Sequence, residues 1–365
     1  MSISTIAIIG AGTMGTGIAT ASAAHGMAVI LLDETEAATK RAIETAATFY
    51  DRSVEKGRMG ESDATAAKER LTSAADLADV APADVVIEAV FEDFSLKASL
   101  FEKLNDVVRD DTLVATNTSC LRVSDLAGHL TDPSRFLGLH YFSPAQINPL
   151  VEVVKGERTS EATIATALAF CRATGKDPLT CEDQYGFAIN RFFCPYTNEA
   201  AHALDQELGN TADIDLIAKE ALGVAAGPFQ VMNLIKPRIN LHAIRNLEPL
   251  GAFYAPARSM VATGEANESW EIGEPSGPEA AAQKAIADRL RAGVFLPVLQ
   301  SLDEAVAAPA DIDRGARAAL KFGRPPCALM DELGRDEVLR IIEPACKSFM
   351  IKVPAAIDRV GELVD

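Results

Sequence analysis

A histidine and a glutamate twelve residues apart suggest proton-transfer chemistry in this chain. His140 ends the apolar run 136–139, and Glu152 lies within the apolar run 151–154. An imidazole, with an ordinary pKa of about 6.5, can take the proton of a hydroxyl group, and a carboxylate behind it stabilises the imidazolium that forms. The pair therefore suits the oxidation of an alcohol. Taken alone, each residue is better explained as a hydrogen-bonded interior side chain, so further support is needed.

A glycine-rich turn near the start of the chain gives that support. A Gly-x-Gly-x-x-Gly motif follows the β-branched run 5–9 and opens an Ala-rich segment over 13–25, which predicts a helix. The first glycine makes a tight turn, the second lets the backbone approach a pyrophosphate, and the third permits close helix–strand packing. The start of the helix adds N–H groups for a phosphate. The predicted cofactor turn comprises Gly10, Gly12, Thr13, Met14 and Gly15.

An aspartate in the right place indicates which dinucleotide would bind. Asp33 follows the second apolar run, 29–32, and lies 23 residues after Gly10. Its carboxylate can accept hydrogen bonds from both hydroxyls of the adenosine ribose and would repel a 2′-phosphate, which favours NAD over NADP. The competing interpretation is a phosphate-free turn in a fold of the same kind that binds no nucleotide.

Short apolar runs separated by helix-length segments predict the fold of the first half. They indicate parallel strands that are buried on both faces. We therefore expect residues 1–185 to form a doubly wound α/β domain of the Rossmann type that binds NAD. The further predicted strands are 85–87, 113–115, 136–139 and 151–154, and the segment 94–108 is one of the predicted helices.

Polar residues follow several of these strands where the strands end. Asn117 and Ser119 come directly after the run 113–115, and His140 closes the run 136–139. Ligands of open α/β sheets bind at the carboxyl ends of the strands. We therefore expect a hydroxyl, an imidazole and the Glu152 carboxylate to face one crevice.

The second half is helical and contains an internal duplication. After Gly186 the strand-like runs nearly vanish. At an offset of 98 residues, Arg191 matches Arg289, the Ala-Asp-Ile-Asp at 212–215 recurs at 310–313, and a Pro-x-x-x-Met at 228–232 recurs at 326–330. We predict two tandem all-α domains. The first covers residues 186–280, including a partly irregular connector over 237–278, and the second covers residues 281–365.

Composition and charge exclude several classes of function. The net charge is −18, and neither half carries an excess of basic residues, so nucleic acid and anionic membrane surfaces are not expected partners. The six cysteines lack the spacing of a zinc site, so no metal is predicted and they are interpreted as reduced thiols. Because neither a signal peptide nor an apolar run of membrane-spanning length is found, we predict a cytoplasmic protein.

Six stretches distributed over most of the chain resemble the L-3-hydroxyacyl-CoA dehydrogenases of fatty-acid β-oxidation. The resemblance implies NAD as the cofactor, an acyl-CoA as the substrate and oxidation of its C3 hydroxyl to a ketone. The matching stretches are IAIIGAGTMGTGIA, VVIEAVFEDFSLKASLF, ATNTSCL, GLHYFSPAQINPLVEVV, GFAINRFFCPYTNEA and DIDLIAKEALGVAAGPFQVMNLI.

The same resemblance implies roles for individual residues. His140 would be the catalytic base and Glu152 its partner. Ser119 and Asn190 would donate hydrogen bonds to the C3 oxygen of the substrate. The remaining positions implied by the resemblance are Glu92, Lys97 and Asn117 with Ser119 on the cofactor side, and Lys56 near the CoA nucleotide.

Two departures from the family pattern affect expectations. Ser143 stands where the family usually has Asn, so a cofactor contact would come from a shorter side chain and the affinity for NAD would be lower. The segment Glu182-Asp183-Gln184-Tyr185 adds bulk and negative charge before the substrate-side helix, which affects the expected acyl-chain preference.

Two other functions stay open at this point. The same fold and residues could oxidise a free hydroxy acid or a carnitine-like alcohol. The chain could also be a nucleotide-binding protein that no longer catalyses, although the set of Ser119, His140, Glu152 and Asn190 argues against this. If the two helical copies pair with each other, the apolar face of each is covered within one chain, which favours a monomer; a dimer is left open.

Overall fold

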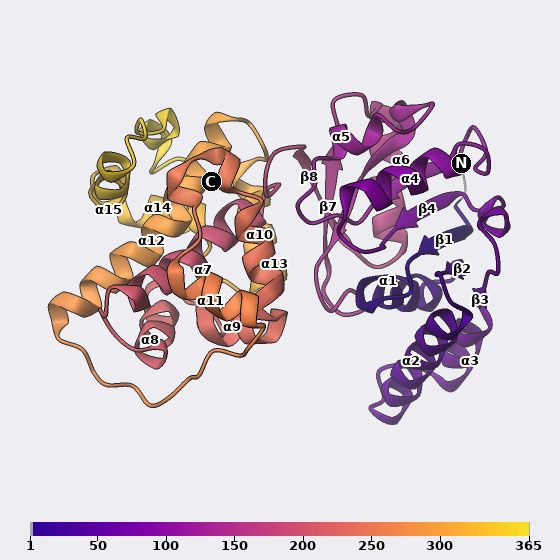
Figure 1. Cartoon of the computed structure of the whole chain (residues 1–365), viewed down its shortest axis with the longest axis horizontal. Coiled ribbons are helices and arrows are strands. Elements are labelled where there is room, and N and C mark those ends of the chain that lie inside the picture. Colours follow the sequence, from indigo (N-terminus) through magenta and orange to yellow (C-terminus); the bar gives the residue numbers. More distant parts are fainter. Residues whose placement is uncertain (1–2, 365) are drawn as a thin grey trace. The chain divides into compact units, whose positions relative to one another are not determined.

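The computed structural model describes residues 3–364 and divides them into two compact units (Figure 1). The residues up to Asp183 form an α/β unit, and those from Gln184 form a helical unit. This division lies within two residues of the predicted end of the NAD-binding domain. No helix in the described part of the chain is long and apolar enough to cross a membrane.

The α/β unit is built on one sheet, with the strand order β3-β2-β1-β4-β5-β6-β7-β8. Its strands are β1 (Thr5–Ile9), β2 (Ala28–Leu32), β3 (Leu71–Ser73), β4 (Val85–Glu88), β5 (Leu113–Thr116), β6 (Phe136–Tyr141), β7 (Leu150–Lys155) and β8 (Asp177–Glu182). Its helices are α1 (Thr13–Ala24), α2 (Glu36–Glu55), α3 (Glu61–Glu69), α4 (Phe94–Leu104), α5 (Val123–Ala127) and α6 (Glu161–Ala173), with 3₁₀ turns at Leu77–Val80 and Pro133–Arg135. The predicted Rossmann-type architecture is confirmed.

One strand runs against the expected direction. The sequence predicts parallel strands throughout, but β7 pairs antiparallel with β6. Only residues 142–149 connect the two strands, and a parallel return needs a crossover of about a dozen residues or more, so the chain can only turn back. The remaining neighbours in the sheet pair in parallel. The expectation for β7 was therefore wrong, and its reversed direction places Glu152 directly opposite His140.

The helical unit contains the two sequence copies. Its helices are α7 (Asn190–Asp205), α8 (Thr211–Leu222), α9 (Pro228–Ile235), α10 (Pro237–Arg245), α11 (Arg258–Ala266), α12 (Ala280–Asp303), α13 (Pro309–Leu320), α14 (Pro326–Leu333) and α15 (Arg335–Ser348), with 3₁₀ turns at Glu248–Leu250, Ala252–Tyr254 and Ala355–Arg359. An offset of 98 residues maps α8 onto α13 and α9 onto α14 end to end. The connector holds α10 and α11, and a long loop leads from α11 to α12 (Figure 1).

The two copies pair with each other, as the duplication predicts. Val224 forms an antiparallel bridge with Phe322, the residue 98 positions further on. The flanking hydrogen bonds are also equivalent, because Ala225 donates its N–H to Lys321 O (3.3 Å) and Gly323 donates its N–H to Gly223 O (2.9 Å). A contact in which equivalent residues meet reciprocally indicates a pseudo-two-fold axis at this bridge. The copies are thus two halves of one compact unit, and the predicted boundary at 280/281 separates repeats within it.

Candidate active site

The glycine turn has the geometry that a dinucleotide site requires. Gly10 has φ +110°, and a Cβ there would lie 2.4 Å from Ala89 O. A Cβ on Gly15 would lie 1.8 Å from Gly10 O, so neither position accepts a side chain. Gly12, in contrast, has open space in front of it, with no atom within 4 Å of a Cβ. The backbone at Gly12 is therefore the place where a phosphate can approach closely.

The start of α1 and Asp33 complete this turn. Gly12 is the N-cap of α1, which carries Thr13 and Met14 in its first turn and no acidic residue there. Such a helix start favours an anion. Asp33 accepts the Ala11 N–H through Oδ2 at 2.7 Å. Asp33 thus holds the glycine turn, a contact that the sequence pattern did not indicate.

His140 and Glu152 form a buried pair across two strands. They are direct partners in the β6–β7 register, and His140 Nδ1 lies 2.7 Å from Glu152 Oε2. Glu152 has no exposed surface, and His140 is 6% exposed. The Phe142 ring packs against the imidazole, with ring centroids 4.5 Å apart. The carboxylate fixes the orientation of the imidazole, so the geometry is that of a base with its supporting acid.

The loop after β5 is held by hydrogen bonds on both sides. Asn117 Oδ1 accepts the Tyr141 N–H at 3.0 Å, which ties this loop to the residue after His140. Ser119 donates its N–H to Glu92 Oε1 at 3.0 Å. Glu92 comes from the loop after β4, so the structure brings Ser119 and Glu92 together.

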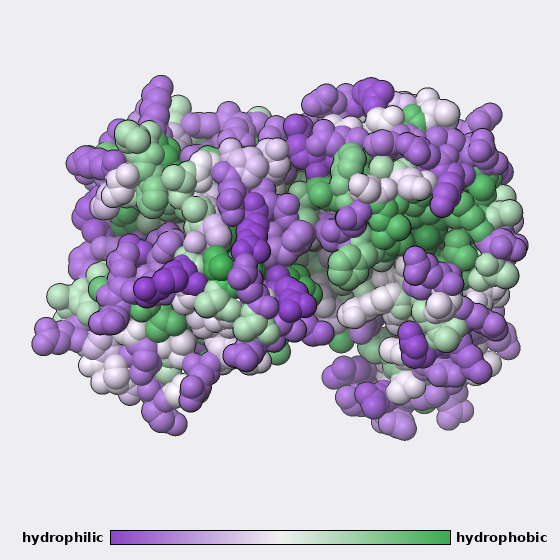
Figure 2. Space-filling view, viewed as in Figure 1, coloured by the Kyte–Doolittle hydropathy of each residue, from purple (hydrophilic) through white to green (hydrophobic). Residues whose placement is uncertain are grey.

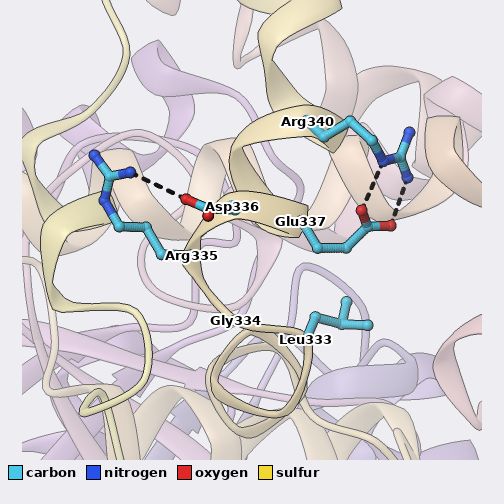
Figure 3. Close-up of a pocket in the computed structure, with 6 residues that line it drawn as sticks. All are labelled: Leu333, Gly334, Arg335, Asp336, Glu337 and Arg340. Atoms are coloured by element: carbon cyan, nitrogen blue, oxygen red, sulfur yellow. Dashed lines mark hydrogen bonds and ion pairs between the residues drawn. The ribbon is translucent and has the colours of Figure 1, made fainter.

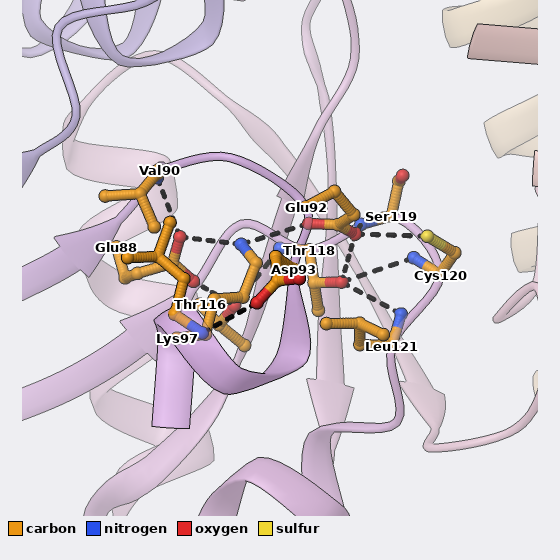
Figure 4. A network of polar contacts seen from close by, with 11 residues as sticks. Glu88, Val90, Glu92, Asp93, Lys97, Thr116, Thr118, Ser119, Cys120 and Leu121 are labelled. Carbon is orange, nitrogen blue, oxygen red and sulfur yellow. Dashed lines mark hydrogen bonds and ion pairs between the residues drawn. The ribbon is translucent and has the colours of Figure 1, made fainter. Parts of the chain in front are cut away.

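Glu92 belongs to a network of polar contacts (Figure 4). It accepts hydrogen bonds from the hydroxyl of Thr118 and the thiol of Cys120, and it pairs with Lys97 at 3.0 Å. Burial raises the pKa of Glu92, but Lys97 and these hydrogen bonds outweigh burial and lower its pKa to about 2. Glu92 is consequently ionised throughout the neutral range and fixes the loop that carries Ser119.

Lys97 is almost completely buried, whereas a residue that contacts a cofactor needs an exposed surface. Its side chain is 1% exposed, and Nζ is 2.6 Å from Glu88 Oε1. Glu88 also accepts from the Thr116 hydroxyl at 2.6 Å and from the Val90 N–H at 2.7 Å. Lys97 therefore forms ion pairs with both Glu88 and Glu92 inside the unit. Its place among the cofactor contacts stays a prediction.

Three other predicted residues lie on other segments of the chain. Ser143 is exposed in the turn between β6 and β7, and Lys56 is exposed at the C-cap of α2. Asn190 is the first residue of α7 and belongs to the helical unit. Phe91, which the sequence analysis did not single out, is 83% exposed beside Glu92. Figure 2 shows an apolar area over β1 and β4 of this unit, the kind of surface that usually lines ligand pockets.

One residue of the acidic segment before α7, Asp183, makes contacts within the α/β unit. Asp183 is buried, and its carboxylate accepts the N–H groups of Val123 (2.9 Å) and Ser124 (2.7 Å) at the start of α5. The negative charge of Asp183 is thus used within the α/β unit, where α5 follows the Ser119 loop. The expectation that Asp183 adds charge on the substrate side is not supported by these contacts.

A surface hollow in the second copy carries none of the predicted residues (Figure 3). Its two arginines are neutralised, because Arg335 pairs with Asp358 at 3.0 Å and Arg340 pairs with Glu337 at 2.7 Å. It lies at the start of α15 and is lined by Leu333, Gly334, Arg335, Asp336, Glu337 and Arg340. Within residues 3–364, no group of His, Cys, Asp and Glu side chains could hold a metal ion.

Comparisons with known proteins point to one family. The family model "3-hydroxyacyl-CoA dehydrogenase, NAD binding domain" matches residues 5–184, and the model "3-hydroxyacyl-CoA dehydrogenase, C-terminal domain" matches residues 186–270. The chain is 33% identical to the mitochondrial hydroxyacyl-coenzyme A dehydrogenase of Mus musculus over 264 residues, which are 70% of this chain and 84% of that protein.

Solved structures extend the likeness. An (S)-3-hydroxybutyryl-CoA dehydrogenase from Ralstonia eutropha is 31% identical, with a TM-score of 0.71 over 75% of this chain and 100% of that one. A 3-hydroxybutyryl-CoA dehydrogenase from Escherichia coli K12 shares the fold over 100% of this chain and 99% of its own, with a TM-score of 0.89 at 24% identity. The chain belongs to the 3-hydroxyacyl-CoA dehydrogenase family.

Proposed function

We propose that this chain oxidises an L-3-hydroxyacyl-CoA to the 3-oxoacyl-CoA with NAD, reversibly, and that His140 is the base. The observation that carries the proposal is the buried contact of 2.7 Å between His140 Nδ1 and Glu152 Oε2. It lies at the carboxyl end of β6, in the sheet that also carries the glycine turn. A catalytically retired relative would have no need to keep this pair.

In the proposed reaction, the C3–H bond and the O–H bond of the substrate both break. The hydride and the proton go to two different acceptors. Because Nδ1 is bound to Glu152, Nε2 of His140 is the nitrogen that takes the hydroxyl proton. The chemistry that bound NAD would supply is that of a hydride acceptor for the hydrogen on C3. As C3 becomes a carbonyl carbon, the imidazole becomes an imidazolium, and the adjacent Glu152 carboxylate stabilises the new charge. The proton then leaves His140 for solvent, which closes the cycle.

The C3 oxygen needs donors as well as a base. We propose that Ser119 and Asn190 donate hydrogen bonds to this oxygen and hold the hydroxyl toward His140. Support for Ser119 comes from its fixed backbone, which Glu92 holds at 3.0 Å. Two such donors orient the substrate in both directions of the reaction.

The residues around the glycine turn fit NAD. The open face at Gly12 accommodates a pyrophosphate, and the first turn of α1 offers N–H groups from Thr13 and Met14. Asp33 uses Oδ2 for Ala11, so Oδ1 is the oxygen proposed to accept the ribose hydroxyls. We propose Asn117 and Ser143 as further cofactor contacts, and Lys56 as a contact of the CoA nucleotide.

A direct assay separates the proposed substrate class from its alternatives. Purified protein is mixed with NAD and either L-3-hydroxybutyryl-CoA or free 3-hydroxybutyrate, and NADH is followed by its absorbance. We expect turnover with the CoA ester and a kcat/KM for the free acid that is lower by orders of magnitude. Equal rates would favour a hydroxy-acid dehydrogenase, and no turnover with any hydroxyacyl-CoA would favour a retired protein.

Replacing Asp33 with Ser should weaken the choice of NAD over NADP. The substitution removes the carboxylate that repels a 2′-phosphate, and it also removes the acceptor for the Ala11 N–H. We expect the ratio of kcat/KM for NAD over NADP to fall by at least ten-fold. The measurement compares both cofactors at one substrate concentration. An unchanged ratio in a folded variant would contradict the role of Asp33.

We also propose the location and assembly of the chain. A reducing, cytoplasmic compartment is supported by six cysteines that are all buried and form no disulfide in the described residues. A monomer is supported by the pairing of the two helical copies at Val224 and Phe322. We propose the three segments 1–185, 186–280 and 281–365 as the domains of the chain, and the 98-residue offset supports the division of the helical part into two copies.

A further inference from the structure

We infer that the second helical copy positions Asn190 through an ion pair between the buried Arg191 and Glu304, whose side chain is 40% exposed. The inference rests on the proposed function, in which Asn190 binds the C3 oxygen of the substrate. It gives the second copy a part in catalysis, although the copy itself contributes no residue to the proposed chemistry.

The contacts of Arg191 carry this inference. Arg191 follows Asn190 in the first turn of α7, and its side chain is 1% exposed. Its Nη2 donates to Glu304 Oε1 at 2.6 Å, and Glu304 is the C-cap of α12 in the second copy. The guanidinium also lies over the Tyr254 ring, 5.9 Å from the centroid. Three separate segments of the helical unit therefore meet at this side chain.

The backbone before α7 is held to the same point. Arg191 donates its N–H to Gly186 O at 2.9 Å and Nη1 to Tyr185 O at 3.4 Å. Gly186 has φ +78°, and a Cβ there would lie 2.8 Å from Arg191 N, so the turn packs directly on the helix start. Tyr254 in turn donates its hydroxyl to Gln300 of α12. The start of α7, where Asn190 lies, is thus held both by the preceding turn at Gly186 and by contacts with α12.

Physical reasoning explains why this anchor matters. A buried guanidinium is costly unless it keeps its partner, so a shift of the start of α7 that breaks the contact with Glu304 is opposed. A displacement of about 1 Å in a substrate-orienting group can lower the rate by about 10²-fold. Glu304 lies beyond residues 186–270, which the C-terminal family model matches, so the anchor comes from the additional copy.

The duplication provides a matched control. Arg289 is the counterpart of Arg191 at the 98-residue offset, and its Nη1 lies 3.3 Å from Glu199 Oε2 across the same pair of helices, α7 and α12. Both ion pairs join the two copies. Glu199, however, lies nine residues further along α7 than Asn190, so the loss of this pair does not release the start of the helix.

The test uses the full chain with acetoacetyl-CoA and NADH. Glu304→Ala should lower kcat by about ten-fold to 10²-fold with the KM for NADH unchanged, since the affected group contacts the acyl substrate only. Glu304→Gln keeps an oxygen that can accept from Arg191 and should recover part of the loss. Arg289→Ala should change the melting temperature by a similar amount to Glu304→Ala but leave kcat within about two-fold.

A double substitution gives the decisive readout. If Glu304 acts through Asn190, then Glu304→Ala should have no further effect on kcat in a chain that already carries Asn190→Ala. Multiplicative losses in the double variant would overturn the inference, as would equal losses of kcat in Arg289→Ala and Glu304→Ala. Absence of turnover by the unsubstituted chain would instead overturn the proposed function, and this inference with it.

Discussion

Replacing His140 with Gln should lower kcat by at least about 10²–10⁴-fold, the range typical of lost general-base catalysis. Gln can still donate a hydrogen bond to Glu152, so the β6–β7 pair should stay folded, but its amide cannot take the hydroxyl proton. The affinity for NAD should stay within a few fold, because His140 lies apart from the glycine turn. Stopped-flow or steady-state rates with a 3-hydroxyacyl-CoA, together with NADH binding followed by fluorescence, measure both quantities.

A companion variant, Glu152→Gln, tests the partner of the base. It keeps the shape of a buried side chain and the contact at 2.7 Å, but a neutral amide no longer stabilises the imidazolium. We expect a smaller fall in kcat than in His140→Gln. A near-normal kcat in His140→Gln would remove the assignment of the base, and an unchanged rate in Glu152→Gln would leave Glu152 with a packing role only.

Much of the cofactor side could be predicted because its constraints are local. Ala89 O leaves no room for a Cβ at Gly10, and Gly10 O leaves none at Gly15. Glycines are therefore required at a fixed spacing in the sequence. The helix start and the aspartate after β2 follow at set distances. Each of these features depends on a few consecutive residues, so the pattern survives without knowledge of the rest of the fold.

The contacts that fix the site could not be predicted in the same way. Whether Glu152 faces His140 depends on the direction of β7, and the apolar run 151–154 reads the same for either direction. Asp183 and Asp33 show the same limit. Asp33 accepts one backbone N–H and Asp183 accepts two, all from segments distant in the sequence, and such contacts leave no periodic signal.

The duplication illustrates a third case, in which comparing the chain with itself supplies long-range information. The offset of 98 residues joins Asp215 to Asp313. In the structure, each of these aspartates accepts two N–H groups at the start of a following helix: Phe229 and Gln230 in the first copy, Cys327 and Ala328 in the second. A repeated pattern thus reflects a repeated cap, and the shared bridge at Val224 and Phe322 follows from the same symmetry.

Ending the chain before Ala281 should abolish the stable monomer. The second copy covers the apolar side of α7, where Phe322 packs against Phe192 and Tyr196 with ring centroids 5.9 and 5.7 Å apart. Removing the second copy would also take away Glu304, the ion-pair partner of Arg191. Burying one large apolar side chain is worth about 1.5–3 kcal/mol, so exposing several removes a large share of the usual margin of stability of about 5–15 kcal/mol. We expect the shortened chain to dimerise through the uncovered face or to aggregate.

Light scattering at micromolar concentration measures this outcome, with the full chain expected to be monomeric on dilution.

Phe322→Asp offers a milder test within the full chain, because Phe322 is 2% exposed and a carboxylate there would face two aromatic rings. That variant should lose at least about 3 kcal/mol of unfolding free energy. Leu234→Asp, at a side chain that is 80% exposed, should lose little. A shortened chain that stays monomeric and melts like the full one would show that α7 needs no cover, and a full chain that persists as a dimer would place the subunit contact on another surface.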